Sequence, residues 1–225
     1  MNAKVREMIK DALQADGVEE IFKMGEESEG VSDLFDPDYL AKIDKIKLPN
    51  TKIKLLQQLL AKAIEDFKKV NKVQAHDFSK RFKALVDAYN ERKEDDVLVS
   101  DVLEDFSVEI IDMIHALKDE YASFEDLGID IEEKAFYDIL KRLAVKYDFS
   151  YPEDKLLPLA QEVKAVVKDK VKYTDWNQRD DIKAELKVGL ILVLAKHGYP
   201  PVDRDEVYKE IFEQAENFKQ HDINN

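Results

Sequence analysis

Apolar residues recur at every third or fourth position through most of this chain, which is the spacing of one face of an α-helix. The clearest example runs from Ile53 to Val70, where the apolar positions form one continuous stripe. No stretch of useful length alternates apolar and polar residues with the period of a strand. The pattern therefore predicts an all-α fold, an irregular multi-helix bundle of about seven to nine helices. We expect helices at about residues 3–24, 36–47, 51–70, 78–89, 100–121, 131–147, 150–171, 174–198 and 203–218.

A strong helix stop follows the apolar run at residues 190–195. Gly198 can adopt the left-handed conformation that closes a helix, and neither Pro200 nor Pro201 can continue one. We expect the apolar run to form a buried helix and the stop to set the direction of the terminal helix. The residues given this structural role are Trp176, Gly198, Tyr199, Pro200 and Pro201, with Leu186 and Leu190 helping to hold the last two helices together.

Glycine and proline also suggest where the chain divides. The polar, acidic stretch GEESEG at residues 25–30 reads as a linker, so we expect residues 1–35 to be a flexible helical segment followed by an acidic linker. Residues 36–220 would then form one helical domain, and 221–225 a disordered tail. Pro158 lies inside an expected helix, where it predicts a kink or a restart.

Composition narrows the class of protein. Hydrophobic residues make up 44% and charged residues 37%, and there are only 6 glycines and 6 prolines, which suits a helix-rich soluble chain. The chain has no cysteine, which excludes disulfides and thiolate chemistry and is compatible with a cytoplasmic location. Residues 1–13 lack the apolar core of a secretory signal, and no apolar stretch is long enough to span a membrane, so we expect no membrane contact.

The net charge of −14 is unevenly distributed along the chain. Residues 42–83 hold twelve lysines and arginines against four acids, whereas residues 91–133 hold sixteen acids against three basic residues. The basic segment has three interpretations: a solvated helix face, a face paired with acids of the same domain, or a face that contacts phosphates. The candidate DNA-binding residues are Lys52, Lys54, Lys62, Lys68, Lys69, Lys72, Lys80, Arg81 and Lys83.

Candidate catalytic and metal-binding residues are missing from the sequence. It contains no Walker-type or dinucleotide-binding glycine loop and no paired histidines at metal-ligand spacing. Glu153, Asp154 and Glu162 with Lys164 match the residue types and order of a nuclease motif. We reject this match because such motifs lie on strands, whereas these residues fall on expected helices. In a chain rich in Glu and Lys, such matches also arise by chance. We therefore predict no catalytic residue, no metal site and no cofactor in this chain.

Several ordered motifs carry a resemblance to a known family. The stretch DWNQRDDIK at 175–183 leads to HGYPP at 197–201, then to EVY at 206–208 and IFEQAE at 211–216. KIDKIKLPNTKIKLLQQLL at 42–60, YNERKEDD at 89–96 and EEKAFYDIL at 132–140 belong to the same pattern. These stretches resemble the C-terminal helical region of the motor/endonuclease (R) subunit of type I restriction-modification enzymes, over nearly all of residues 1–220.

The resemblance implies a role in assembly. The parent subunit is an ATP-dependent type I site-specific deoxyribonuclease and DNA translocase that uses ATP and Mg²⁺ in other domains. Its C-terminal helical domain is regarded as attaching the motor to the methyltransferase and specificity subunits, close to double-stranded DNA. The acidic face of the terminal helix would then meet a partner through Glu206, Glu210 and Glu213. The alternative is a purely structural protein–protein interaction module without DNA contact. A free-standing enzyme would need a clustered polar pocket.

Overall fold

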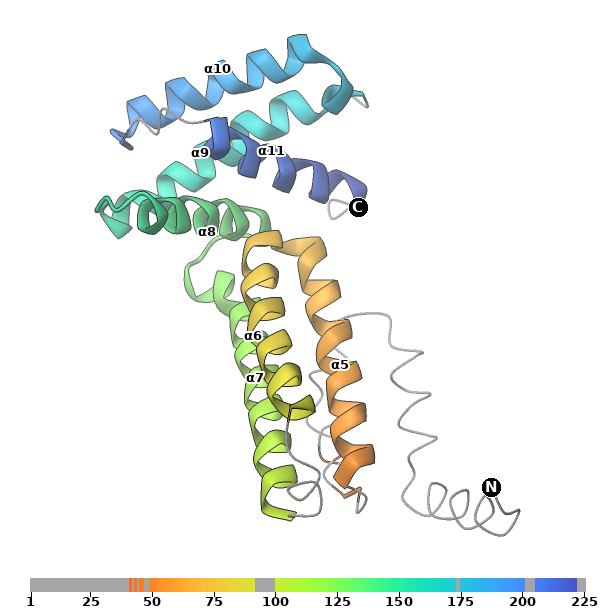
Figure 1. Cartoon of the computed structure of the whole chain (residues 1–225). Coiled ribbons are helices and arrows are strands. Elements are labelled where there is room, and N and C mark those ends of the chain that lie inside the picture. Colours follow the sequence, from red (N-terminus) through yellow and green to blue (C-terminus); the bar gives the residue numbers. More distant parts are fainter. Residues whose placement is uncertain are drawn as a thin grey trace. The chain divides into compact units, whose positions relative to one another are not determined.

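The computed structural model describes residues 49–91, 100–172, 175–200 and 205–221, together with residues 41, 43, 45 and 46. Every regular element within these residues is helical, so the predicted all-α fold is confirmed (Figure 1). The helix expected at 3–24, the linker, most of the helix at 36–47 and the end of the tail lie outside the described residues. The helices are α5 (Pro49–Val70), α6 (Lys72–Asn90), α7 (Ser100–Asp126), α8 (Ile131–Lys146), α9 (Glu153–Val171), α10 (Asp180–Lys196) and α11 (Asp205–Gln220), with a short 3₁₀ helix, η2 (Trp176–Gln178), before α10.

The described chain forms two compact units. Unit 1 takes the residues up to Phe67 and the stretch Asp77–Tyr121, and unit 2 takes Lys68–His76 and the residues from Ala122 onward. Both units are therefore built from separate stretches of sequence. The predicted domain boundaries at residues 35 and 220 stay predictions, because the flanking residues are for the most part not described.

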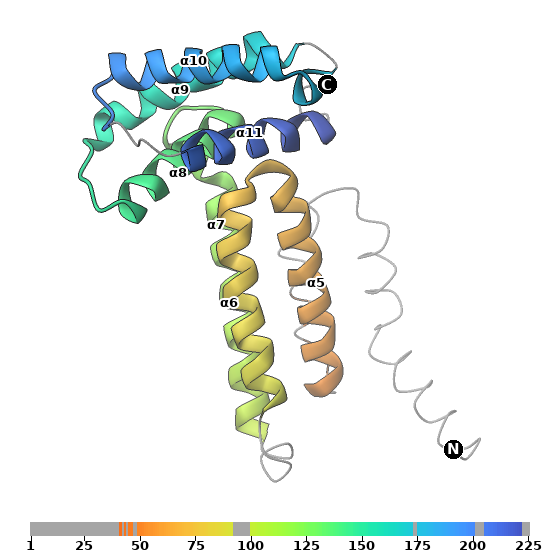
Figure 2. The same ribbon diagram turned by 45° about the horizontal axis from the view of Figure 1, so that its top comes forward.

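Unit 1 is a bundle in which α5, α6 and α7 lie side by side (Figures 1 and 2). Aromatic rings join all three helices. The Phe67 ring lies 6.2 Å from that of Phe78 and 5.8 Å from that of Tyr121, and the Tyr89 and Phe106 rings are 4.9 Å apart. The apolar stripe of α5 faces this core as the sequence predicts, with its members Ile53, Leu56, Leu60, Ala63, Ile64 and Phe67 buried.

Unit 2 is built around the packing of α8 on α9. Helix α10 lies along α9 on the outside of the unit, and α11 packs on α8 and α9 (Figure 1). Leucine, valine and isoleucine side chains from all four helices fill the space between them. The most completely buried of these are Ile139, Leu140, Leu143, Leu159, Val163, Leu186, Leu190, Val207 and Ile211.

Trp176 and Tyr199 anchor the connections on either side of α10 in this core. Trp176 is fully buried and meets the ring of Phe212 on α11 at 6.5 Å. The Tyr199 hydroxyl donates a 2.9 Å hydrogen bond to the carbonyl of Leu140 on α8. The sequence analysis predicts that these side chains hold the last two helices together. Trp176 does contact α11, but Tyr199 bonds to α8 and α10 packs along α9, so this region also attaches to the other helices of unit 2.

The helix stop behaves as predicted. Gly198 has a φ of +64°, and the bonds from its amide to Ala195 and from the Tyr199 amide to Leu194 close the last turn of α10. The beginning of this region differs from the prediction. Instead of one helix from Thr174, the short η2 comes first, and an extended Arg179 (φ −101°, ψ 109°) separates it from α10. Pro201 lies outside the described residues.

One further expectation is wrong, and another is decided only in part. Helix α9 continues through Pro158, so the helix does not restart there, and the kink stays a prediction. This proline lies near the helix start and is exposed, so the carbonyl that loses a bond there can reach water. The apolar run of α10 is not a buried helix, because only Leu190 and Leu194 are buried, whereas Ile191 and Leu192 are 43% and 65% exposed.

Candidate functional site

The nine candidate DNA-binding residues are divided between the two units. Unit 1 carries Lys52, Lys54 and Lys62 on α5 and Lys80, Arg81 and Lys83 on α6, and unit 2 carries Lys68, Lys69 and Lys72. In unit 1, Lys54, Lys80, Arg81 and Lys83 are exposed, and Lys52 and Lys62 are half-buried.

The cations of α6 project from its solvent side. Phe78 on the same helix is buried, and the guanidinium of Arg81 lies over its ring at 5.3 Å. This stacking fixes the direction of the Arg81 side chain but leaves the residue exposed. Lys80 and Lys83 are also exposed, so α6 presents three cations within four residues.

Helix α7 of the same unit has the opposite charge. Its exposed positions include the acids Glu104, Asp105, Glu109, Asp112 and Asp119. Because α7 buries Leu103, Ile110 and Leu117 on its inner face, these acids lie on its solvent side. Within this bundle the exposed cations Lys54, Lys80, Arg81 and Lys83 lie on α5 and α6, beside the exposed acids Glu65, Asp77 and Asp87, and the exposed charges of α7 are mainly carboxylates.

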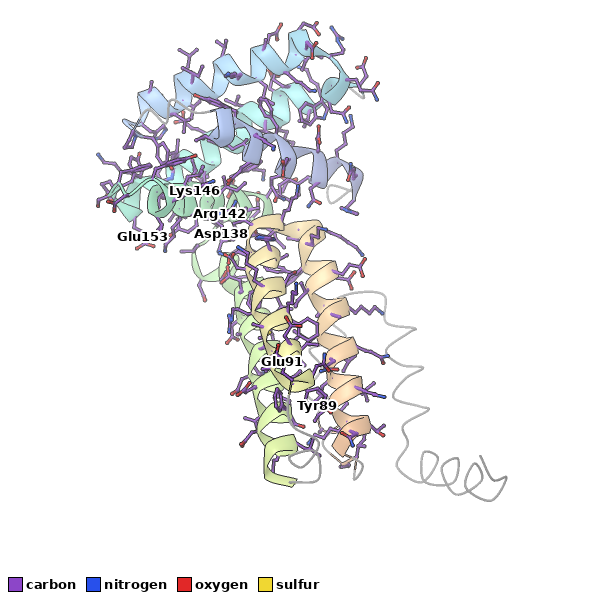
Figure 3. All side chains as sticks on the ribbon, viewed as in Figure 1. Tyr89, Glu91, Asp138, Arg142, Lys146 and Glu153 are labelled. Atoms are coloured by element: carbon purple, nitrogen blue, oxygen red, sulfur yellow. The ribbon has the colours of Figure 1, made fainter. Side chains whose placement is uncertain are left out.

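The acids proposed to bind a partner make contacts within unit 2. Glu210 is 2.6 Å from Arg142 and 3.8 Å from Lys146, both on α8, where Figure 3 labels them. Glu213 is 2.6 Å from Lys72 and also approaches Lys209 at 3.9 Å. Glu206 lies in α11, and its side chain is outside the described part. The two acids whose side chains are described thus help to attach α11 to the rest of unit 2.

A buried polar cluster that the sequence analysis missed surrounds the turn between α5 and α6. We call it the turn clamp; its members are Asn71, Lys134, Asp138, Gln214 and Asn217, and all five are buried. Asn71 caps α6 by accepting a 3.1 Å bond from the Gln74 amide. Its amide nitrogen donates to Asp138 at 2.6 Å, and Lys134 bonds both oxygens of that carboxylate at 2.7 and 2.6 Å.

Helix α11 completes the turn clamp. Gln214 accepts a 3.0 Å bond from the Lys72 amide and donates a 3.0 Å bond to the carbonyl of Val70. Asn217 donates to the carbonyls of Lys68 and Lys69 at 2.8 and 2.7 Å. The carbonyls at the end of α5 and the amide at the start of α6 thereby obtain hydrogen-bond partners. Without these side chains, these backbone groups would be buried and unpaired. A signal was present in the sequence, since Gln214 and Asn217 interrupt the apolar stripe of α11.

The shifted pKa values of Glu153, Glu162 and Tyr199 in unit 2 have two causes, hydrogen bonds from side-chain donors and burial. A hydrogen bond from Lys141 lowers the pKa of Glu153, with a second from the Tyr137 hydroxyl. Hydrogen bonds from Lys196 and His197 lower the pKa of Glu162. Burial raises the pKa of Tyr199 well above its usual range, so this hydroxyl stays protonated. The shifts of the two glutamates are thus explained by their hydrogen-bond donors, and that of Tyr199 by its burial.

Groups suited to metal chemistry are not gathered in the described residues, where no three His, Asp or Glu side chains are placed to hold an ion. A pocket in unit 2 is lined by Lys164, Lys168 and Lys219 and by apolar residues that include Phe136 and Phe218. Lys164 is already bound by Asp130 and by Glu132, which also lines the pocket. Among the described helices, none is long and apolar enough to cross a membrane.

Comparison with known proteins identifies the family. The family model described as "Type I restriction enzyme HindI endonuclease subunit-like, C-terminal" matches residues 1–221. The "Type I restriction enzyme HindI endonuclease subunit" of Haemophilus influenzae is 22% identical over 94% of this chain and 19% of its own length. The "Putative type I restriction enzyme MjaIXP endonuclease subunit" of Methanocaldococcus jannaschii is 20% identical over 95% of this chain and 20% of its own length.

This chain thus spans about a fifth of the length of these relatives. No solved structure matches it. The family match extends over both units and includes the motifs on which the resemblance was based. The chain belongs to the family of C-terminal regions of type I restriction endonuclease subunits.

Proposed function

We propose that this chain is a non-catalytic assembly module of a type I restriction enzyme, which attaches the ATP-dependent translocase and endonuclease to the methyltransferase–specificity core and contacts DNA through the basic face of unit 1. The observation that carries the DNA contact is the exposure of Lys54, Lys80, Arg81 and Lys83 on two helices of one bundle whose third helix is acidic. Exposed lysines and arginines on one element are the residues with which proteins neutralise backbone phosphates.

The acidic α7 restricts how DNA could approach. Its exposed carboxylates repel phosphates, so a duplex would be oriented toward α5 and α6 and away from α7. This gives the small bundle a direction on DNA without any base contact, as suits a module attached to a motor that moves along DNA of any sequence. Sequence recognition would remain with the specificity subunit.

The attachment function rests on family membership and on the surface of unit 2. We keep Glu206, Glu210 and Glu213 as the predicted partner-binding residues, with one difference. Glu210 and Glu213 also hold α11 through Arg142 and Lys72, so a partner would meet a helix that is already fixed in place. ATP and Mg²⁺ belong to the parent subunit in this proposal, because this sequence has no phosphate-binding loop.

A salt titration of binding to a nonspecific DNA duplex tests the DNA contact. The variant Lys54→Glu/Lys80→Glu/Lys83→Glu removes three exposed cations of unit 1. The control Lys118→Glu/Lys155→Glu/Lys168→Glu changes the net charge equally at exposed positions outside the basic segment. We expect the slope of log K against log salt to become less steep by about 2.7 in the first variant, whereas the control weakens binding only slightly.

The alternative, a protein-only module, makes the opposite prediction. If the wild-type chain does not bind duplex DNA even at about 50 mM salt, or if both variants weaken binding equally, the DNA contact is wrong. A pull-down with the methyltransferase–specificity core then tests attachment separately. The isolated chain should show neither ATPase nor nuclease activity, and detection of either would refute the non-catalytic assignment.

A further inference from the structure

Helix α10 has an apolar outer face that no other described element covers. Val188, Ile191 and Leu192 are 55%, 43% and 65% exposed, and Ala184 and Ala195 extend the same face at either end. The opposite side of the helix carries Ile182, Leu186, Leu190 and Leu194, which are buried in the core of unit 2. The helix is therefore apolar on both sides, although it lies on the outside of the unit (Figure 1).

This exposure is concentrated in one place. Among the described residues, the large hydrophobic side chains that are exposed are Val108, Val145 and the three on α10. Single exposed residues such as Val108 and Val145 are ordinary, but three adjacent ones with alanines at both ends form a patch, and apolar patches mark interaction surfaces. Ion pairs between α9 and α10 border it on one edge, at Glu185–Lys170 (3.0 Å) and Lys196–Glu162 (2.7 Å).

The spacing of the patch indicates that a helix binds it. Ala184, Val188, Ile191 and Ala195 follow one another at intervals of four, three and four residues. This is the alternation of core positions in a coiled coil, in which the apolar seam of one helix faces the seam of another. Leu192 lies beside this seam and widens it.

The symmetry of this seam and the charges at the two ends of α10 favour α10 of a second copy of this chain as the helix that binds here. The seam has small residues at both ends and large ones in the middle, so it reads nearly the same in both directions. In an antiparallel pair, Ala195 of one copy would face Ala184 of the other, and Ile191 would face Val188. Such a two-fold arrangement is the usual symmetry of a homodimer.

The charges agree with the same arrangement. Acids lie at the N-terminal end of α10, at Asp180 and Asp181, and Lys196 lies at its C-terminal end. In an antiparallel pair each acidic end meets a basic end, and the two helix dipoles also oppose each other favourably. The Asp181 and Lys196 side chains are 62% and 66% exposed, so both are accessible to a second molecule although each has an ion-pair partner in its own chain.

We propose that α10 pairs with α10 of a second copy of this chain, antiparallel about a two-fold axis, with Asp181 of each copy facing Lys196 of the other. A pair of helices of this length buries less surface than the roughly 1,200–2,000 Å² of a typical stable complex. The dimer is therefore weak and forms in the micromolar range, which suits two copies held at high local concentration on one DNA molecule or in one complex.

Sedimentation equilibrium of the 225-residue chain from about 1 to about 300 µM tests the pairing. We expect the mass to rise from 26.1 kDa toward twice that value over this range. Ile191→Glu should keep the chain monomeric. Val145→Glu, which adds the same charge at an exposed valine on α8 of the same unit, should leave dimerisation unchanged.

A charge reversal tests the antiparallel orientation. Asp181→Lys or Lys196→Glu alone should weaken the dimer several-fold, and the double variant should restore it. A helical circular dichroism spectrum and an unchanged melting temperature show that each variant is folded. A wild-type chain that stays monomeric at all concentrations overturns the proposal and leaves this face to a helix from elsewhere in the parent subunit or from another protein. The proposal is also wrong if Ile191→Glu does not weaken the dimer. It is wrong as well if the double variant does not restore the dimerisation that Asp181→Lys and Lys196→Glu each weaken.

Discussion

Replacing Gln214 by methionine should destabilise unit 2 more than any change at an exposed glutamine. Gln214 is 1% exposed, and its side chain serves two backbone groups of the turn, the amide of Lys72 and the carbonyl of Val70, at 3.0 Å each. Methionine has nearly the same length and volume, so packing is kept while both hydrogen bonds are lost. The substitution thus isolates the hydrogen-bonding part of the turn clamp.

The magnitude follows from what is left behind. A buried donor or acceptor without a partner costs about 1–3 kcal/mol, and here there are two, so the loss is about 2–6 kcal/mol. Burying the apolar methionine side chain instead of an amide returns about 1 kcal/mol. We therefore expect unit 2 to lose about 1–5 kcal/mol of stability, compared with the 5–15 kcal/mol typical of a native domain.

Urea denaturation followed by tryptophan fluorescence measures this loss directly. The chain has one tryptophan, Trp176, which is fully buried in unit 2, so its emission reports the unfolding of that unit. Gln220→Met, at an exposed position of the same helix, is the matched control and should change stability by no more than about 0.5 kcal/mol. If Gln214→Met is as stable as this control, the reasoning about the turn clamp is wrong.

Three more predictions concern single contacts in unit 2. Asp138→Leu and Lys134→Met should each cost about 3–5 kcal/mol by leaving a buried charge alone, while the double variant should cost less than the sum in a double-mutant cycle. Gly189→Ala should destabilise the chain in thermal melts, because the new Cβ would lie 2.8 Å from Cγ1 of Val166, and Val166→Ala in the same chain should relieve the contact. Although burial acts to raise it, the pKa of Asp130 is lowered by its bonds to the Lys164 ammonium and to backbone amides. A lowered carboxyl pKa stabilises the fold above the unfolded-state pKa and loses this effect as the pH falls. The stability difference between wild type and Asp130→Asn should therefore shrink from about pH 6 to about pH 3, and a difference independent of pH would contradict the assignment.

The sequence predicts the local features of this fold well. The spacing of apolar residues identifies the helices and the inner face of α5, and the stop at Gly198 needs only the glycine and the residues after it. These features depend on residues that are close together in the sequence, so the local pattern of residue types is enough to predict them. The motifs of the last two helices likewise identify the family from the sequence alone, without any knowledge of three-dimensional contacts.

The features that the sequence did not predict depend on contacts between distant residues. Glu210 looks like an acid on an exposed helix face until Arg142, far away in the chain, is seen beside it. Gln214 and Asn217 look like interruptions of an apolar stripe until the turn at Asn71 supplies their partners. The all-round apolar character of α10 predicted burial, because a pattern cannot distinguish a helix inside a core from one that has a second apolar face at the surface.

The division of unit 2 into two stretches of sequence has a consequence for how the protein is made. Its turn segment, Lys68–His76, leaves the ribosome long before α11, yet the backbone of that segment needs Gln214 and Asn217 to complete its hydrogen bonds. Unit 2 therefore cannot complete these hydrogen bonds until α11 has also been translated. Chains truncated before Gln214 should accordingly leave unit 2 sensitive to protease.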